Sequence, residues 1–160
     1  MTNGLVENSA AFSDVLNNSH APVIVGGFQA MNIAEVLSFN SPVNHAQTTI
    51  INNYLAAKYG LELTDGANTT NLYTDDSYIH DLIGVGKTKD LDNSTIVEHN
   101  YSSGGGLEMQ GLTLAGEAFV FAGHNGASVS SADNWERKWN IETTGDAADV
   151  KFFFDFEAVG

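Results

Sequence analysis

Apolar and polar residues alternate in the second half of the chain, with the period of a half-buried β-strand. In "DVKFFFDFEAV", one face holds Val150, Phe152, Phe154 and Phe156, and the other holds Lys151, Phe153, Asp155 and Glu157. In "WERKWNI", one face holds Trp135, Arg137, Trp139 and Ile141. Strands are expected at 78–86, 94–100, 106–114, 117–123, 134–142 and 149–157. Their short, regular spacing is typical of β-sandwiches and β-barrels.

The first forty residues predict two more strands. "APVIVGGF" (21–28) is a β-branched run that ends in two glycines. "NIAEVLSFN" (32–40) alternates less cleanly, because Ala34, Glu35 and Leu37 blur the period. A strand is still expected there, since the run is short and rich in branched and aromatic residues.

One helix is expected over 42–59. Ser41 is placed to be its N-cap, and Pro42 occupies the first helical position, where a missing N–H costs nothing. Gly60 stands where a left-handed residue ends a helix. Apolar residues recur at helical spacing, which predicts packing on a sheet, with Asn52, Asn53 and Lys58 toward water.

Length and composition narrow the class of protein. A chain of 160 residues fits one domain, and we expect a single, mostly β, antiparallel sandwich over 1–160. It has no cysteine, which excludes thiol catalysis, disulfides and thiolate metal sites. The net charge of −14 argues against nucleic acid and anionic membranes as partners. No apolar run is long enough for membrane insertion, and the N-terminus has no signal-peptide pattern, so general secretory export is not expected if Met1 is the native start.

Gly86-Lys87-Thr88 in "HDLIGVGKTKD" matches the end of a phosphate-binding loop, but two requirements of that motif fail. Asp81 stands five positions before Gly86, where the motif needs a glycine, and its carboxylate would repel phosphate. The residues after Thr88 show no helical pattern that could receive an anion at a helix N-terminus. Gly84 and Gly86 are expected to allow a bulge or a close backbone approach at a strand end. Gly104-Gly105-Gly106 is expected to be a flexible loop between strands.

No catalytic residues are predicted. The five histidines, His20, His45, His80, His99 and His124, show no metal-binding or catalytic spacing. Glu35, Glu108 and Glu117 lie in or near predicted strands without the spacing of a glycosidase pair. No cofactor is predicted: the oxygen ligands in "TDD" (74–76) and "DLDN" (90–93) would suit calcium, but the preferred interpretation is that they are turn residues of an acidic protein.

Two stretches resemble domains of bacterial surface proteins. "NIAEVLSFN" and "IINNYLAAKYGLEL" are similar to the last strand and following helix of laminin-G-like, concanavalin-A-like jelly rolls. "HDLIGVGKTKD" and "WERKWNIETTGDAADVKFFFD" resemble the uncharacterised β-rich domain that often follows such a jelly roll. The resemblance covers about 22–156 and implies jelly-roll-end strands plus helix over 1–60 and a β-rich sandwich over 61–160.

The resemblance implies an extracellular surface, adhesion and carbohydrate contact. It supplies only the last strands of a jelly roll, and an incomplete sandwich has open edges that pair with other chains. The first hypothesis is therefore a non-catalytic module that binds a surface glycan through exposed loop residues. The rival is a structural subunit, such as a decoration or fibre protein on a virion exterior or a filament subunit. A glycoside hydrolase ranks third.

Overall fold

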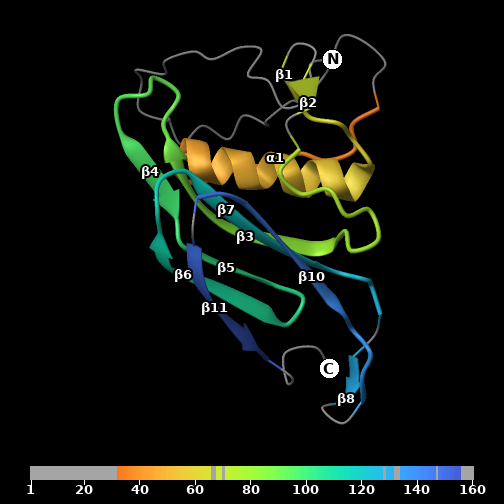
Figure 1. The fold of residues 1–160 in the computed structure, drawn as a ribbon. Helices are drawn as coiled ribbons and strands as arrows, with labels where there is room; N and C mark the ends of the chain where they lie inside the picture. The colour runs from red at the N-terminus through yellow and green to blue at the C-terminus, as the bar shows by residue number, and fades with distance from the viewer. Residues whose placement is uncertain are drawn as a thin grey trace. The chain divides into compact units, whose positions relative to one another are not determined.

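A computed structural model describes residues 32–155, except residues 66, 67, 70, 128, 132, 133 and 147. The described residues belong to two units, one that ends at Pro42 and one that begins at Val43. The second unit has one helix, a four-stranded antiparallel sheet and a three-stranded antiparallel sheet (Figure 1). The prediction of a mostly β, antiparallel sandwich with one helix is confirmed. Among the described residues, no helix has the length and apolar character needed to cross a membrane.

The elements follow one another in a helix-first order. They are α1 (His45–Tyr59), β1 (Thr64–Asp65), β2 (Asn68–Thr69), β3 (His80–Lys89), β4 (Ile96–His99), β5 (Tyr101–Gly104), β6 (Leu107–Leu114), β7 (Ala118–His124), β8 (Val129–Ser131), β9 (Asn134–Trp135), β10 (Trp139–Gly145) and β11 (Ala148–Phe154).

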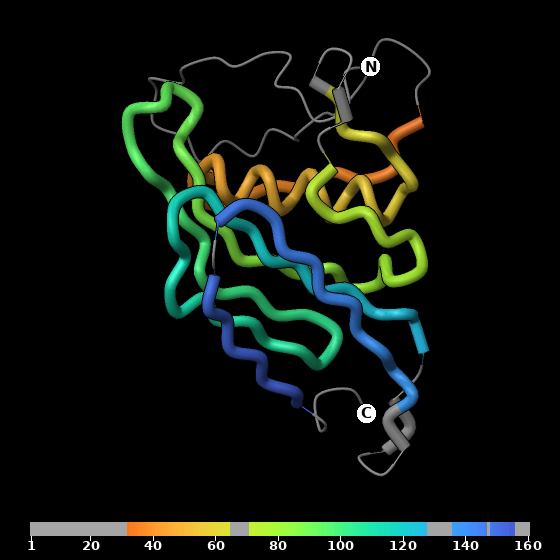
Figure 2. Tube along the Cα trace, viewed as in Figure 1, coloured from red at the N-terminus to blue at the C-terminus, as the bar shows by residue number. Residues whose placement is uncertain are grey.

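The two main sheets share a continuous edge. The larger sheet has the order β10-β7-β3-β4, and the smaller has the order β11-β6-β5. The chain passes from β4 to β5 through Asn100 alone, so one run of chain borders both sheets (Figure 2). The other pairs, β1-β2 and β8-β9, are short hairpins.

Two apolar cores fill the space between the three layers. The helix-side core joins α1 to one face of β3 and β7, and contains Ala46, Ile50, Tyr73, Leu82, Phe119 and Phe121. The inter-sheet core joins the opposite face of β3 and β7 to the smaller sheet, and contains Ile83, Val85, Leu107, Met109, Val120 and Ala122. Because both faces of β3 and β7 are covered, their sequences are apolar runs instead of alternating ones.

Glycines in β3 make room for aromatic rings of β7. A Cβ atom on Gly84 would lie 2.9 Å from the Phe121 ring, and one on Gly86 would overlap the ring of Phe119. These two phenylalanine rings stack with centroids 6.1 Å apart. The expectation was a bulge or a close backbone approach at a strand end, whereas the structure places side-chain rings over these glycines within β3, which continues to Lys89.

The start of α1 differs from the prediction. The N-cap is Asn44, not Ser41, and Pro42 precedes the helix instead of opening it. Asn44 and Gln47 form a capping box, in which each side chain bonds the other residue's backbone N–H at 2.9 Å. This reciprocal pair satisfies two N–H groups that Ser41 would leave open. At the other end, Gly60 adopts the predicted left-handed conformation with φ 61°.

Several strand predictions need correction. Residues 32–39 form no strand, and the apolar side chains of Ile33, Val36 and Phe39 are exposed, because the blurred alternation offers no single face to a core. The expected strand 134–142 is broken at 136–138 into β9 and β10. β5 was not predicted, and Gly104 belongs to it, while Gly105 and Gly106 form the turn into β6. The expected strand 21–28 lies outside the described residues.

Asn53 is also corrected: it was expected toward water but is only 2 % exposed. Its side-chain oxygen accepts the backbone N–H groups of Leu72 and Tyr73, at 2.8 Å and 3.2 Å. Its amide group donates to the carbonyl of Thr49 at 2.9 Å. A polar residue on the buried side of α1 therefore fixes the loop that leads to β3.

Candidate functional site

Gly86-Lys87-Thr88 lies inside β3, and the element that follows is strand β4. The Lys87 ammonium group donates to the carbonyl oxygen of Leu114 at 3.1 Å. Because no helix N-terminus follows the triplet, no ring of backbone N–H groups is available for phosphate. The geometry thus agrees with the interpretation of these residues as part of a strand.

A histidine–aspartate cluster lies where β3 begins and β7 ends. The Nε2 atom of His124 is 2.8 Å from Oδ2 of Asp81. His124 is 2 % exposed, while the side chain of Asp81 is 54 % exposed. Asp81 has φ 46°, at an irregularity in the β3–β7 pairing, and such bulges redirect side chains. The ring of His80 stacks on His124 at 5.6 Å, and Trp139 meets His124 edge-on at 4.9 Å.

Both ring nitrogens of His124 are occupied. The backbone N–H of Gly126 donates to Nδ1 at 2.9 Å, so the proton of the neutral ring is on Nε2 and is donated to Asp81. A general base needs a free ring nitrogen within reach of its substrate. His124 would have to break one of these hydrogen bonds to act as a general base. We therefore interpret the His124–Asp81 hydrogen bond as a structural contact that joins β7 to β3.

Burial lowers the pKa of His124 below the ordinary value of 6.5, although the hydrogen bond to Asp81 opposes this. The neutral ring is favoured in the folded protein, so the unfolded chain takes up the proton first as the pH falls. The stability that the neutral ring contributes is therefore present above pH 6.5 and is lost as the pH falls toward the lowered pKa.

We predict that the ring of His124 titrates below pH 6.5 in a nuclear magnetic resonance titration of the folded protein. We also expect urea unfolding to become easier as the pH falls below 6.5, with a weaker pH dependence in His124→Gln. Burial likewise lowers the pKa of His99, so His99→Gln is the control that separates the two contributions. A His124 pKa above 6.5 would contradict this prediction.

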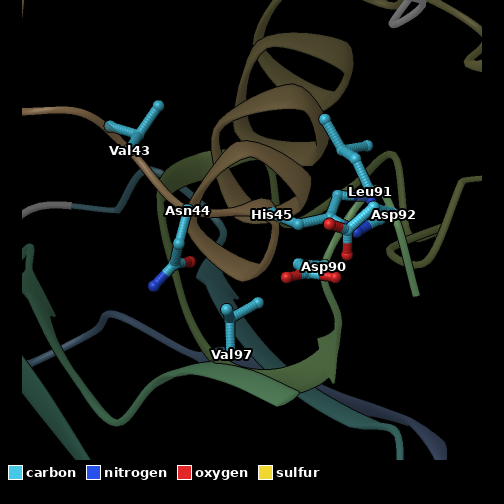
Figure 3. A pocket seen from close by; sticks show the side chains of 7 residues that line it. All are labelled: Val43, Asn44, His45, Asp90, Leu91, Asp92 and Val97. Atoms are coloured by element: carbon cyan, nitrogen blue, oxygen red, sulfur yellow. The ribbon is translucent and has the colours of Figure 1, made fainter. Parts of the chain in front are cut away.

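A shallow hollow of about 310 Å³ lies between the start of α1 and the β3–β4 turn (Figure 3). It is lined by Val43, Asn44, His45, Asp90, Leu91, Asp92 and Val97. Figure 3 shows Asp90 and Asp92 on the His45 side of the helix start, with Asn44 and Val43 on the other side. The hollow thus brings the "DLDN" loop next to the first turn of α1.

The polar groups of this hollow are used within the protein. His45 Nδ1 is 2.7 Å from the carbonyl oxygen of Lys89, and the Asn44 amide donates to the carbonyl of Glu98 at 3.1 Å. The carboxylate of Asp90 accepts the backbone N–H of Ser94 and the hydroxyl of Thr95. The pKa of Asp90 lies well below its usual range. The largest cause is the hydrogen bond from the Thr95 hydroxyl, and the second is the interaction with the side chain of Asp92. These bonds fasten α1 and the turn to the edge of the larger sheet.

The other predicted calcium loop lies at the opposite end of α1. Asp75 and Asp76 help to line a hollow of about 350 Å³ beside Gly60 and Leu61. The carboxylate of Glu142 accepts the backbone N–H groups of Thr74 and Asp75 there. Among the described residues, no three histidine or carboxylate side chains come together as metal ligands. The expectation of no cofactor, with calcium as the alternative, stays a prediction.

Two of the glutamates considered for glycoside hydrolysis, Glu108 and Glu117, lie apart from each other in the same unit. Glu108 is near the start of β6, and Glu117 follows its end, so about 20 Å of extended chain separates them. Glycosidase pairs lie about 5–10 Å apart. Glu35 belongs to the irregular segment before Pro42. This segment is part of a different unit from Glu108 and Glu117.

The outer face of the smaller sheet is open and chemically mixed. Strand register places Tyr101, Gln110 and Lys151 in one row across the three strands. Ser103, Glu108 and Phe153 form the next row. Tyr101 is 50 % exposed and Phe153 is 49 % exposed. We call these six residues the polar–aromatic face.

The polar groups of this face have no partners inside the described part of the chain. There, the side chains of Tyr101, Ser103, Glu108, Gln110 and Lys151 make no hydrogen bond or ion pair. They therefore differ from the polar groups of the His124 cluster and of the hollow in Figure 3, which are bonded within the protein. The polar–aromatic face therefore has hydrogen-bonding groups left for a ligand.

Comparison of the chain with protein-family models, with curated proteins and with solved structures finds no match. The alternation in "DVKFFFDFEAV" already placed Lys151 and Phe153 on one side of a strand. Tyr101 was missed because β5 has no apolar alternation of its own.

Proposed function

We propose that this chain is a non-catalytic β-sandwich module of an exterior surface, which contacts glycans through the polar–aromatic face. The proposal rests on one observation. Two half-exposed aromatic rings share an open sheet face with polar side chains that have no partners among the described residues.

This combination suits the chemistry of a sugar. The faces of a sugar ring carry C–H groups, which are attracted to the negative face of an aromatic ring such as Tyr101 or Phe153. Its hydroxyl groups donate and accept hydrogen bonds, as do the amide of Gln110 and the carboxylate of Glu108. A ligand that has both surfaces at once fits a face that has both.

The size of the face favours a glycan over a folded protein. Three strands spaced about 4.8 Å apart and four paired residues along β5 give an area on the order of 200 Å². A stable protein partner needs about 800 Å² on each side. The exterior location is supported by the net charge of −14 and by the resemblance to bacterial surface domains.

A glycan array with the purified chain tests the proposal. We expect binding to at least one glycan, and we expect Tyr101→Ala to weaken that binding about tenfold, because it removes one stacking ring. Ile141→Ala is the matched control, since Ile141 is an exposed apolar residue on β10 of the other sheet. Absence of binding across the array, or equal loss in both variants, would overturn the proposal.

A structural subunit is the second candidate, and the outer edge of β10 favours it. Among the described strands, β10 pairs only with β7, and an open edge can pair with another chain. Ile141 on this strand is 44 % exposed. A monomeric mass at high concentration in analytical ultracentrifugation would count against assembly through this edge.

A further inference from the structure

The two aromatic rings of the polar–aromatic face lie at opposite corners. Tyr101 belongs to the first row on β5, and Phe153 belongs to the second row on β11. Ser103 and Lys151 occupy the other two corners. The line from Tyr101 to Phe153 therefore crosses β6 between Gln110 and Glu108.

The strand geometry sets the distance between the rings. Tyr101 and Phe153 are two strands apart, about 10 Å, and two residues apart along the strands, about 7 Å. Their backbone positions are thus separated by roughly 12 Å on the diagonal. One sugar ring cannot stack on both side chains at this distance, so simultaneous contact requires a chain of sugars.

The charge of the face bears on the kind of sugar. Glu108 and Lys151 carry opposite charges, so the face has no net charge of its own. The whole chain carries a net charge of −14, which repels an anionic ligand that approaches from solution. An uncharged sugar needs no opposite net charge on the face, and the net charge of the chain does not repel it.

We infer that the polar–aromatic face binds an extended, uncharged oligosaccharide that lies diagonally from Tyr101 to Phe153. This inference rests on the proposed function. One sugar stacks on each ring, and the sugars between them form hydrogen bonds with Gln110 and Glu108 on β6. Binding then depends on chain length as well as on sugar type.

The test is a length series measured by isothermal titration calorimetry, from mono- to hexasaccharide, for linear glucose oligomers and for any neutral glycan that binds on the array. We expect affinity to rise at least tenfold at the length that reaches both rings. Tyr101→Ala and Phe153→Ala should each remove this gain, so that long oligomers bind like short ones. Tyr101→Phe, which keeps the ring, should retain it.

The outcomes separate this inference from the proposed function. If monosaccharides bind as tightly as hexasaccharides and the variants weaken both equally, the face binds glycans at one ring and the diagonal arrangement is wrong. A parallel series of linear uronic acid oligomers tests the charge, and if these bind more tightly than the neutral ones, the assignment to uncharged sugars is wrong. If no oligomer in either set binds, the proposed function itself fails. Ile141→Ala should behave like the unaltered chain throughout.

Discussion

Replacing Gly123 with alanine is expected to lower the free energy of unfolding by about 3 kcal/mol or more. Gly123 lies in β7, and a Cβ atom there would overlap the carbonyl oxygen of Tyr78 and approach the Tyr73 hydroxyl to 2.9 Å. Tyr73 donates to that same carbonyl at 2.8 Å, so the obstructing atoms are held in place. Equilibrium unfolding in urea measures the loss.

Gly60→Ala is the control for this change. Gly60 has a left-handed conformation that favours glycine, with φ 61°, which Gly123 does not share, and no heavy atom lies within 4 Å of the position of its Cβ. Only the cost of a left-handed alanine applies there, about 1 kcal/mol. A loss in Gly123→Ala no larger than the loss in Gly60→Ala would show that the 73–78 segment does not pack on β7 as described.

Asn53→Leu is expected to cost about 3 kcal/mol, because it leaves one buried and one part-buried N–H group without acceptors. These are the backbone N–H groups of Leu72 and Tyr73, which now share the side-chain oxygen of Asn53. Leucine has the same branching and the same number of side-chain heavy atoms as asparagine, so the substitution leaves no cavity. Urea unfolding gives its size, and faster hydrogen exchange at Leu72 and Tyr73 would locate it.

Thr49→Ala is the matched change on the same helix. The Thr49 hydroxyl donates to the carbonyl of His45 at 2.9 Å, and its removal leaves no buried N–H group unsatisfied. The expected cost is about 1 kcal/mol or less. Equal costs for Asn53→Leu and Thr49→Ala would contradict the role given to Asn53 in fixing the 72–73 backbone.

The sequence pattern predicted the strands that bury one face and the helix that buries one stripe of residues. β11 was found because Val150 and Phe152 face the inter-sheet core while Lys151 and Phe153 face outward. The helix was found from its apolar spacing and Gly60. β5 was missed because "YSSG" has no apolar side to bury, and its pairing with β6 depends on the turn at Gly105 and Gly106.

The candidate sites depend on contacts that no local pattern shows. Asp81 and His124 are 43 positions apart, and only the β3–β7 register brings them together. The polar–aromatic face requires the joint register of β5, β6 and β11, which alternation within one strand does not give. Asn53 was misplaced because its partners, Leu72 and Tyr73, lie about twenty positions away.

β7 has a consequence for how the chain reaches its folded state. Every residue of this strand, "AFVFAGH", is buried, and both of its neighbours, β3 and β10, are distant in the sequence. Such long-range pairing forms slowly, so a newly made chain presents this uncharged segment to other chains before β10 can cover it. Segments of this kind nucleate aggregation. Because β7 contributes to both cores and is exposed until they form, we expect refolding to give less aggregate at low protein concentration or with a chaperone present.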